Sequence, residues 1–440
     1  MKLINKVTKI PENTARVHFI GIGGIGMSAL VRFFVHEGKQ VSGSDRAQSI
    51  ITDKLAKLGV ELFFEQQASN ITPDIDMVVY TEAMPEDHVE MVAARKLGVP
   101  MLNYFSALGL VANEYYLIAV SGTHGKTTTT AMLADVFEEA GLDPTVIVGS
   151  LRSKTGSNFR AGKSKYAIVE ACEYKRDFLY LKPDILVITN LEFEHVDYYQ
   201  DLRDVQAAFR ELALAVPEDG FVVADTSQAN IKPVLEGVKA TIVDYRPHID
   251  LGLALKQPGM HNLLNAAVAK AVGQVVGIDT KEASKTLENF AGTWRRFEYK
   301  GDFVNDFGKV PVYDDYGHHP TEIRATILGA REKYKDNHLT VVFQSHLYTR
   351  TKEFFAEFVS ALAKADRVIM LPIYRARNED TSGVNSEALV EAINRAGTEA
   401  LYFETHSAAA LKVKEITPKD GVVLVMGAGD VTEVATLLVS

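Results

Sequence analysis

The sequence predicts an α/β protein made of three successive domains. Short apolar stretches of strand length alternate with longer stretches of helical pattern along the chain, as in parallel sheets covered by helices. Two glycine-rich turns, at 21–26 and 121–127, each follow an apolar stretch and open a helical one. We therefore place the domains at residues 1–112, 113–290 and 291–440.

The composition limits the class of protein. The 440 residues are 47% hydrophobic and 24% charged, which suffices for several buried cores and argues against a disordered chain. A formal net charge of -10 and the lack of a basic block argue against a nucleic-acid partner. A single cysteine fits a reducing compartment, and no apolar run reaches the roughly 20 residues that a membrane helix needs. We expect a cytoplasmic protein without membrane insertion.

The N-terminal block begins with an apolar strand at 15–20, followed by a glycine-rich turn at 21–26. In the dinucleotide fingerprint the first glycine makes the tight turn, the second lets a diphosphate approach, and the third lets helix and strand pack. An expected strand at 77–80 and helix at 89–97 continue the alternation, so this domain is Rossmann-like. A nicotinamide dinucleotide, a flavin or a nucleotide sugar would suit the turn. The predicted ligand contacts are Gly21, Gly23, Gly24, Gly26, Met27, Ser28 and Asp45.

The central block carries a phosphate loop at 121–127, between an expected strand at 116–120 and a helix rich in alanine and leucine. Its glycines let backbone amides turn toward an anion, and the helix adds its positive end. Lys126 can reach terminal phosphate oxygens, and Thr127 offers a hydroxyl to Mg²⁺. Val120 stands where the usual Walker loop has its first glycine, which points to the shorter loop of ATP-dependent amide ligases.

Acidic side chains follow the next two expected strands. Glu170 and Glu173 come after the strand at 166–169, and His195 lies among the acidic residues after the strand at 185–189. Because parallel strands end at the same edge of a sheet, these groups can share that edge with the phosphate loop. Carboxylates beside a triphosphate suit Mg²⁺, although histidine is one of its less usual ligands. The sequence predicts a metal site with Glu170 and His195.

Arginines and histidines mark the third block. Arg295 and Arg296 follow a glycine, and they could be a solvated pair or could neutralise a phosphoryl group during its transfer. His318 and His319 follow the next expected strand. Because no third ligand stands at metal-like spacing, we prefer substrate contacts for these two histidines.

In their order and combination these segments resemble the Mur ligase family. The resemblance covers nearly the whole chain and rests on 21–30, 123–127, 170–174, 190–197, 259–265, 292–297, 314–320 and 346–351. It implies an N-terminal Rossmann-like domain that binds a UDP-sugar, a central P-loop ATPase-like domain that binds ATP, and a C-terminal Rossmann-like domain that brings the amino acid.

The resemblance also implies roles for the matching residues. The ATP contacts would be Gly122, Thr123, His124, Gly125, Lys126, Thr127, Thr128, His261, Asn262, Asn265, Arg295, Arg296 and Asp315. The metal ligands would be Thr127, Glu170 and His195, with Glu173 behind them. The amino-acid pocket would hold Tyr316, His318, His346 and Arg350, and Arg160 would face the UDP-sugar. The catalytic roles would fall to Lys126, Glu170, His195, Arg296, His318 and Arg350.

The implied reaction is amide formation driven by ATP with Mg²⁺. The lactyl carboxylate of UDP-N-acetylmuramate attacks the γ-phosphate, and the amino group of L-alanine then attacks the acyl phosphate. Arg350 would orient the alanine carboxylate, and His318 or His346 would take the ammonium proton. A monomer or a homodimer is expected.

Two segments depart from the family pattern. The stretch 245–258 is short where close relatives usually have a longer β-containing segment, so we expect the central sheet to lack a hairpin. The stretch 81–84 replaces a pair of small serines on the UDP-sugar side. No carbamylated lysine can be assigned.

Three other interpretations remain open. A murein peptide ligase would attach a tripeptide to the same UDP-sugar and would differ in the acceptor pocket. A NAD(P)-dependent oxidoreductase would explain the turn at 21–26 and Asp45 but not the phosphate loop. A noncatalytic nucleotide-binding regulator would be favoured by loss of catalytic groups, whereas all of these are present: Lys126, Glu170, His195 and Arg350.

Overall fold

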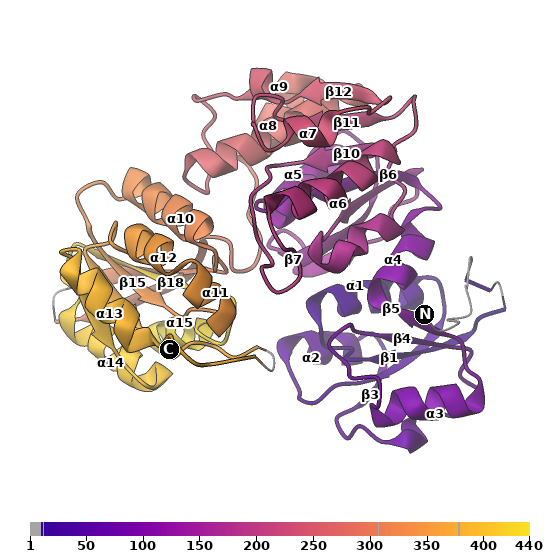
Figure 1. The fold of residues 1–440 in the computed structure, drawn as a ribbon, viewed down its shortest axis with the longest axis horizontal. Coiled ribbons are helices and arrows are strands. Elements are labelled where there is room, and N and C mark those ends of the chain that lie inside the picture. The colour runs from indigo at the N-terminus through magenta and orange to yellow at the C-terminus, as the bar shows by residue number, and fades with distance from the viewer. Residues whose placement is uncertain (1–9, 12, 307, 377–378) are drawn as a thin grey trace. The chain divides into compact units, whose positions relative to one another are not determined.

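The structure is a computed structural model that describes residues 10–11, 13–306, 308–376 and 379–440. It contains three sheets with flanking helices (Figure 1). The chain divides into two compact units. The first runs to Glu192 and includes Val205–His248 and Ala267–Leu287, and the second consists of Phe193–Asp204, Ile249–Ala266 and Glu288–Ser440. The first unit holds two of the sheets and the second holds the third, so the predicted three-domain α/β fold is confirmed.

The N-terminal sheet has five parallel strands in the order β3-β2-β1-β4-β5. The strands are β1 (Arg16–Ile20), β2 (Gln40–Ser44), β3 (Glu61–Phe63), β4 (Met77–Tyr80) and β5 (Met101–Asn103), with α2 (Ile50–Ala56) and the short η1 (Ala68–Asn70) between them. Helices α1 (Ile25–His36) and α4 (Tyr104–Ala112) lie on one side of the sheet, and α3 (Val89–Leu97) lies on the other (Figure 1). Because helices cover both faces, nearly every side chain of β1 and β4 is buried. The strand expected at 77–80 and the helix expected at 89–97 form at those residues.

The central sheet has seven strands in the order β12-β11-β10-β6-β9-β7-β8, and only the edge pair of β7 and β8 is antiparallel. The strands are β6 (Tyr116–Ser121), β7 (Thr145–Arg152), β8 (Ser157–Arg160), β9 (Tyr166–Glu170), β10 (Ile185–Ile188), β11 (Phe221–Ala224) and β12 (Thr241–Asp244). The helices are α5 (Lys126–Glu139), η2 (Tyr174–Tyr180), α6 (Leu202–Leu214), α7 (Lys232–Leu235), η3 (Arg246–His248), α8 (Met260–Val275) and α9 (Thr280–Glu288). Strand β6 lies between β10 and β9, so the phosphate loop, Glu170 and the segment after β10 share one edge, as predicted.

The segment 245–258, all of it described, forms no strand, and the central sheet therefore ends at β12. The short segment predicted that the central sheet lacks a hairpin at this place, and the structure confirms that prediction.

The C-terminal sheet has the order β13-β14-β18-β15-β16-β17, and only β13 runs antiparallel to its neighbour. Its strands are β13 (Glu298–Asn305), β14 (Gly308–Asp315), β15 (His338–Phe343), β16 (Arg367–Met370), β17 (Glu399–Tyr402) and β18 (Gly421–Met426). Its helices are α10 (Pro320–Lys333), α11 (Tyr348–Glu353), α12 (Phe355–Leu362), α13 (Ser386–Arg395), α14 (His406–Ile416) and α15 (Thr432–Val439). Successive residues of β18 enter opposite cores, since Leu424 packs with α10, α12 and α13 while Val423 and Val425 pack with α14 and α15.

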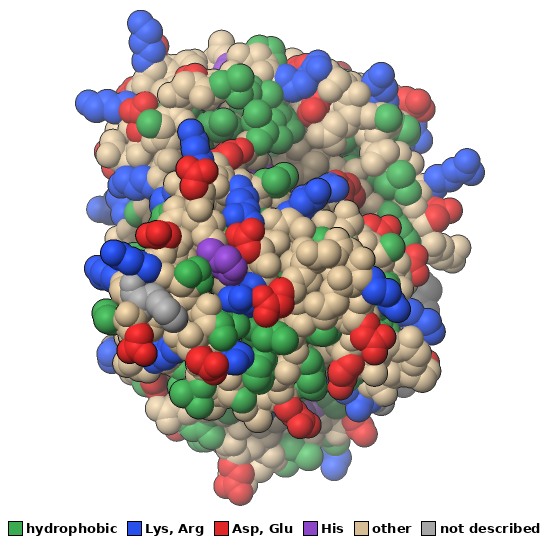
Figure 2. Space-filling model, turned by 90° about the vertical axis from the view of Figure 1, so that its left-hand side faces the viewer, with side chains coloured by type: hydrophobic (Ala, Val, Ile, Leu, Met, Phe, Trp, Pro, Cys, Tyr) green, Lys and Arg blue, Asp and Glu red, His purple; other side chains and the backbone are tan. Residues whose placement is uncertain are grey.

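Acidic and basic side chains are interspersed over the face drawn in Figure 2, and no broad basic area gathers among the coloured residues of that face. Within the described residues, no helix is both long and apolar enough to cross a bilayer.

Candidate functional site

The phosphate loop joins β6 to α5 and depends on two glycines with positive φ. Gly122 has φ 128° and Gly125, which caps α5, has φ 82°. A Cβ added to Gly122 would lie 2.0 Å from Thr189 Oγ1, so only glycine fits at this turn. Thr189 Oγ1 also donates to His124 O at 2.6 Å, and His124 N donates to Asn190 Oδ1 at 3.0 Å. The loop is therefore held by the residues that follow β10.

Lys126 is folded back onto the phosphate loop. Its Nζ donates to Gly122 O at 2.5 Å and to Thr123 O at 3.0 Å. It also forms an ion pair with Glu173 Oε2 at 2.9 Å, and Glu173 is 2% exposed. The buried carboxylate keeps the ammonium charge beside the loop, where terminal phosphates would bind.

Thr127 and Glu170, the predicted metal ligands of the central domain, are in direct contact. Thr127 Oγ1 donates to Glu170 Oε1 at 2.9 Å, and Gly149 N donates to Oε2 of the same carboxylate at 2.7 Å. A hydroxyl and a carboxylate beside a phosphate loop form an oxygen donor set that fits Mg²⁺. His195 lies in the segment Phe193–Asp204 and has a positive φ of 54°. Its metal role stays a prediction.

The glycine turn after β1 is closed by hydrogen bonds. Gly21 N and Ile22 N both donate to Ser44 O, at 2.8 and 3.0 Å. Gly23 N donates to Asp45 Oδ2 at 2.8 Å, so Asp45 holds the turn. The side chains of Met27 and Ser28, two predicted ligand contacts, are buried, at 3% and 0% exposure. Any ligand contact of Met27 or Ser28 therefore has to come from the backbone.

The hairpin of β7 and β8 binds the first helix of the N-terminal domain. Asn158 Nδ2 donates to Ser28 Oγ at 2.9 Å and to Ile25 O, and Asn158 is fully buried. Arg160, the predicted UDP-sugar residue, donates instead to Asp143 Oδ1 and to Pro144 O, each at 2.6 Å. Its role toward substrate stays a prediction.

The two neighbouring arginines of the C-terminal domain have different environments. Arg295 is 4% exposed, its Nε lies 3.2 Å from Asp314 Oδ2, and its Nη1 donates to Gly429 O at 3.1 Å. The solvated-pair interpretation is therefore wrong for Arg295, whose guanidinium holds the ends of β14 and β18 together. The side chain of Arg296 is 26% exposed and its Nη1 lies 3.7 Å from Glu322 Oε1. Arg296 is consequently the better candidate for a phosphate contact.

Asp315, one of the predicted ATP contacts, stabilises the turn around it. Its carboxylate accepts hydrogen bonds from Phe297 N and Gly317 N, each at 2.8 Å. Burial, as the main cause, raises the pKa of Asp315 to about 6.

Three of the predicted ATP contacts lie at the start of α8, namely His261, Asn262 and Asn265. His261 is followed by Asn262, whose Nδ2 donates to Pro258 O at 2.9 Å and lies 3.1 Å from His261 Nε2. Burial lowers the pKa of His261 to about 4, so this ring is neutral at physiological pH. Asn265, one helical turn later, is buried, and its Nδ2 lies 3.4 Å from Asn262 Oδ1.

The four predicted amino-acid contacts lie together in the second unit. The rings of Tyr316 and His318 are 5.5 Å apart and those of His318 and His346 are 6.0 Å apart. Arg350 Nη1 lies 3.4 Å from His346 Nδ1, and Arg350 Nη2 lies 3.1 Å from Glu194 Oε1. Sequence reasoning missed Tyr374, which stacks on His346 with the ring centroids 5.6 Å apart. Its position just after β16, at the polar edge of the sheet, was the available signal.

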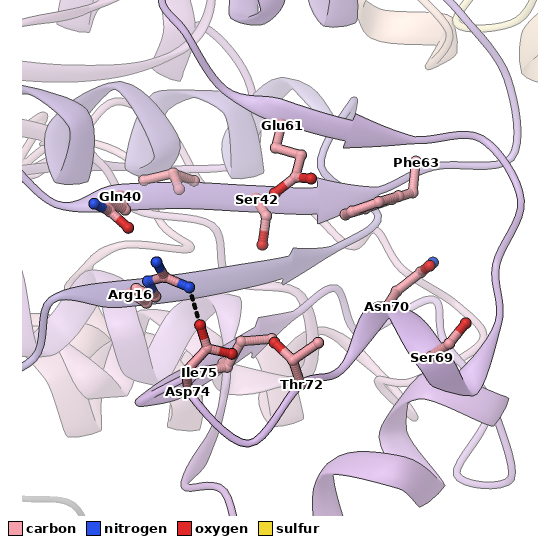
Figure 3. A pocket seen from close by; sticks show the side chains of 11 residues that line it. Arg16, Gln40, Ser42, Glu61, Phe63, Ser69, Asn70, Thr72, Asp74 and Ile75 are labelled. Carbon is pink, nitrogen blue, oxygen red and sulfur yellow. Dashed lines mark hydrogen bonds and ion pairs between the residues drawn. The ribbon is translucent and has the colours of Figure 1, made fainter.

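A separate pocket of about 320 Å³ lies over the N-terminal sheet (Figure 3). Arg16, Gln40 and Glu61, the first residues of β1, β2 and β3, line it, and Arg16 is paired with Asp74. None of the predicted site residues lines this pocket. We therefore assign it no part in the UDP-sugar site.

Three consecutive segments match known domain families. Residues 16–116 match the Mur ligase family, catalytic domain, residues 120–228 the Mur ligase middle domain, and residues 295–429 the Mur ligase, glutamate ligase domain. The chain belongs to the Mur ligase family. The resemblance to this family that the sequence motifs indicated is thus confirmed. The boundaries of the three domains stay a prediction.

Among Mur ligases, the chain is 38% identical to UDP-N-acetylmuramate--L-alanine ligase of Caldanaerobacter subterraneus subsp. tengcongensis, over 96% of this chain and 97% of that protein. The crystal structure of UDP-N-acetylmuramate-alanine ligase MurC from Thermotoga maritima superposes with a TM-score of 0.81 at 29% identity, covering 96% of this chain and 98% of that one. A murein peptide ligase from Psychrobacter arcticus has the same fold, with a TM-score of 0.72 at 22% identity over 96% and 98% of the two chains.

Proposed function

We propose that the protein is an ATP-dependent ligase that joins L-alanine to the lactyl carboxylate of UDP-N-acetylmuramate. The phosphate loop carries the proposal, because the Lys126 ammonium and the contact between Thr127 and Glu170, an oxygen pair that fits Mg²⁺, lie at the start of α5. The chain is similar over almost its whole length to an alanine ligase of the family, and this similarity supports the choice of substrates. Since ATP and nucleotide sugars are cytoplasmic compounds, we place the reaction in the cytoplasm.

The first step transfers the γ-phosphoryl group of ATP to the sugar carboxylate. The Lys126 ammonium and the Arg296 guanidinium would stabilise negative charge on the transferring group. Bound Mg²⁺ would neutralise phosphate charge in the same way, with Thr127 and Glu170 as its protein ligands. The products of this step are an acyl phosphate and ADP.

The second step forms the amide. The α-carboxylate of alanine would pair with the planar guanidinium of Arg350, which is 6% exposed. His318 or His346, whose rings lie 6.0 Å apart, would accept the ammonium proton before the amine attacks the acyl carbon. Phosphate then leaves from the tetrahedral intermediate.

The decisive experiment is phosphate release from ATP with UDP-N-acetylmuramate and one acceptor at a time, followed by product mass. L-Alanine should react best, and glycine and L-serine more slowly, because one methylene or hydroxyl changes binding by only about 1–3 kcal/mol. Preferential use of the L-Ala-γ-D-Glu-diaminopimelate tripeptide would instead establish a murein peptide ligase. Calorimetric binding of NAD or NADP without binding of UDP-N-acetylmuramate would restore the oxidoreductase interpretation.

A further inference from the structure

A tyrosine without a role in the proposed reaction lies beside the glycine turn. Tyr104 is the first residue of α4, which begins after the capping residue Asn103. Its ring packs edge-on against Phe105, with the centroids 4.8 Å apart. A Cβ added to Gly26 would lie 2.8 Å from Tyr104 Cζ and 2.9 Å from its hydroxyl oxygen. The phenol therefore lies directly against the third glycine of the turn.

The turn itself keeps few backbone donors for a ligand. The amides of Gly21 and Ile22 are used by Ser44 O, that of Gly23 by Asp45, and that of Gly24 by Gly21 O at 3.2 Å. Asp45 also brings a negative charge next to the turn. What remains are the first amides of α1, which have no partner inside the helix. A diphosphate at this position would need a further donor.

The Tyr104 hydroxyl is available as that donor. The side chain of Tyr104 is partly exposed, and its hydroxyl forms no hydrogen bond with any other residue in the part of the chain that the structure describes. Burial, and then the negative charge of Glu170, raises the pKa of Tyr104 far above its usual value. The phenol therefore keeps its proton at physiological pH and can donate to an anion.

We propose that the Tyr104 hydroxyl donates a hydrogen bond to the diphosphate of the UDP-sugar. The diphosphate is the expected partner because Gly26 lies in the first turn of α1, where the helix dipole and the free amides favour an anion. The inference rests on the proposed function, since it takes a UDP-sugar as the ligand of this turn.

The test is calorimetric binding of UDP, UDP-N-acetylmuramate and a non-hydrolysable ATP analogue to wild type and Tyr104→Phe. Hydrogen bonds to charged groups contribute enough that UDP and UDP-N-acetylmuramate should each bind about tenfold to a hundredfold more weakly, by the same factor. ATP-analogue binding and the melting temperature should not change. Tyr116→Phe is the matched control, because it removes a hydroxyl at the start of β6. The phosphate loop follows the opposite end of that strand.

Unchanged UDP binding by Tyr104→Phe would refute the contact. A loss confined to UDP-N-acetylmuramate would also refute it, because the hydroxyl would then contact the sugar acid. Both results leave the proposed function standing. If wild type bound neither UDP nor UDP-N-acetylmuramate, the proposed function would fail and this inference with it.

Discussion

Replacing Gly149 by alanine should weaken metal binding without touching a metal ligand. The amide of Gly149 and the hydroxyl of Thr127 hold opposite oxygens of the Glu170 carboxylate, at 2.7 and 2.9 Å. A Cβ at position 149 would lie 2.6 Å from Glu170 Oε2 and 2.8 Å from Cδ and Oε1. Separations below about 3 Å cannot be maintained, so the carboxylate has to turn away from β7.

The size of the effect follows from the hydrogen bond that is lost. A hydrogen bond to a charged group contributes about 1.5–3 kcal/mol, and 1.4 kcal/mol corresponds to a factor of ten. Groups that orient a metal ligand typically change metal affinity by about 10- to 100-fold when they are removed. We expect the Mg²⁺ concentration for half-maximal rate to rise by that factor. The free energy of unfolding should fall by only about 1–2 kcal/mol. The reason is that alanine lowers the conformational entropy of the unfolded chain, which offsets roughly 0.4–1 kcal/mol of the lost hydrogen bond.

The assay is the initial rate of phosphate release against Mg²⁺ concentration at saturating ATP, UDP-N-acetylmuramate and L-alanine. Gly252→Ala is the matched control, since Gly252 is exposed and an added Cβ would meet only Asp250 Oδ1, at 3.4 Å. A folded Gly149→Ala protein with the wild-type Mg²⁺ curve would refute the reasoning that Glu170 is a metal ligand positioned by β7.

Three further predictions concern other residues. Lys126→Ala should lower phosphate release by about a hundredfold or more in a protein that still folds, because glycine geometry shapes the loop and the lysine serves the phosphates. Its melting temperature should fall, because the buried Glu173 carboxylate loses its partner. Near-normal phosphate release would contradict the assignment of the loop. Arg350→Lys should raise the KM for L-alanine by about tenfold while ATP and UDP-sugar bind as in wild type, because an ammonium lacks the planar fork; an equal loss for all three ligands would point to a folding defect. Burial, and then the charge of Glu82, raises the pKa of Asp177 to about 7. Because the folded protein holds this proton more tightly than the unfolded chain does, the free energy of unfolding falls as the pH rises from about 4 to about 7. In urea unfolding, Asp177→Asn should therefore be more stable than wild type at about pH 8, by about 1 kcal/mol or more, and nearly equal to it at about pH 4; a gain that is the same at both pH values would exclude the titration of Asp177 as its cause.

The features that the sequence determined by itself are local ones. The phosphate loop needs glycines with positive φ between a strand and a helix, and that requirement appears within a few consecutive residues, from Val120 to Thr127. The alternation of strands and helices, and hence the three α/β domains, is written in hydrophobic periodicity over similarly short stretches. Lys126 and Glu170 could be named because each follows directly from such a pattern.

Contacts between distant segments were decided only by the tertiary structure. Gly149 reaches Glu170 because β7 pairs with β9, and Tyr104 reaches Gly26 because α4 packs beside α1. Arg295 and Arg296 are identical neighbours in the sequence, yet one is buried against Asp314 and the other is partly exposed. Sheet order and helix packing depend on the summed burial of many side chains, and no short segment contains that sum. A residue's partners across the fold therefore cannot be read from its own segment.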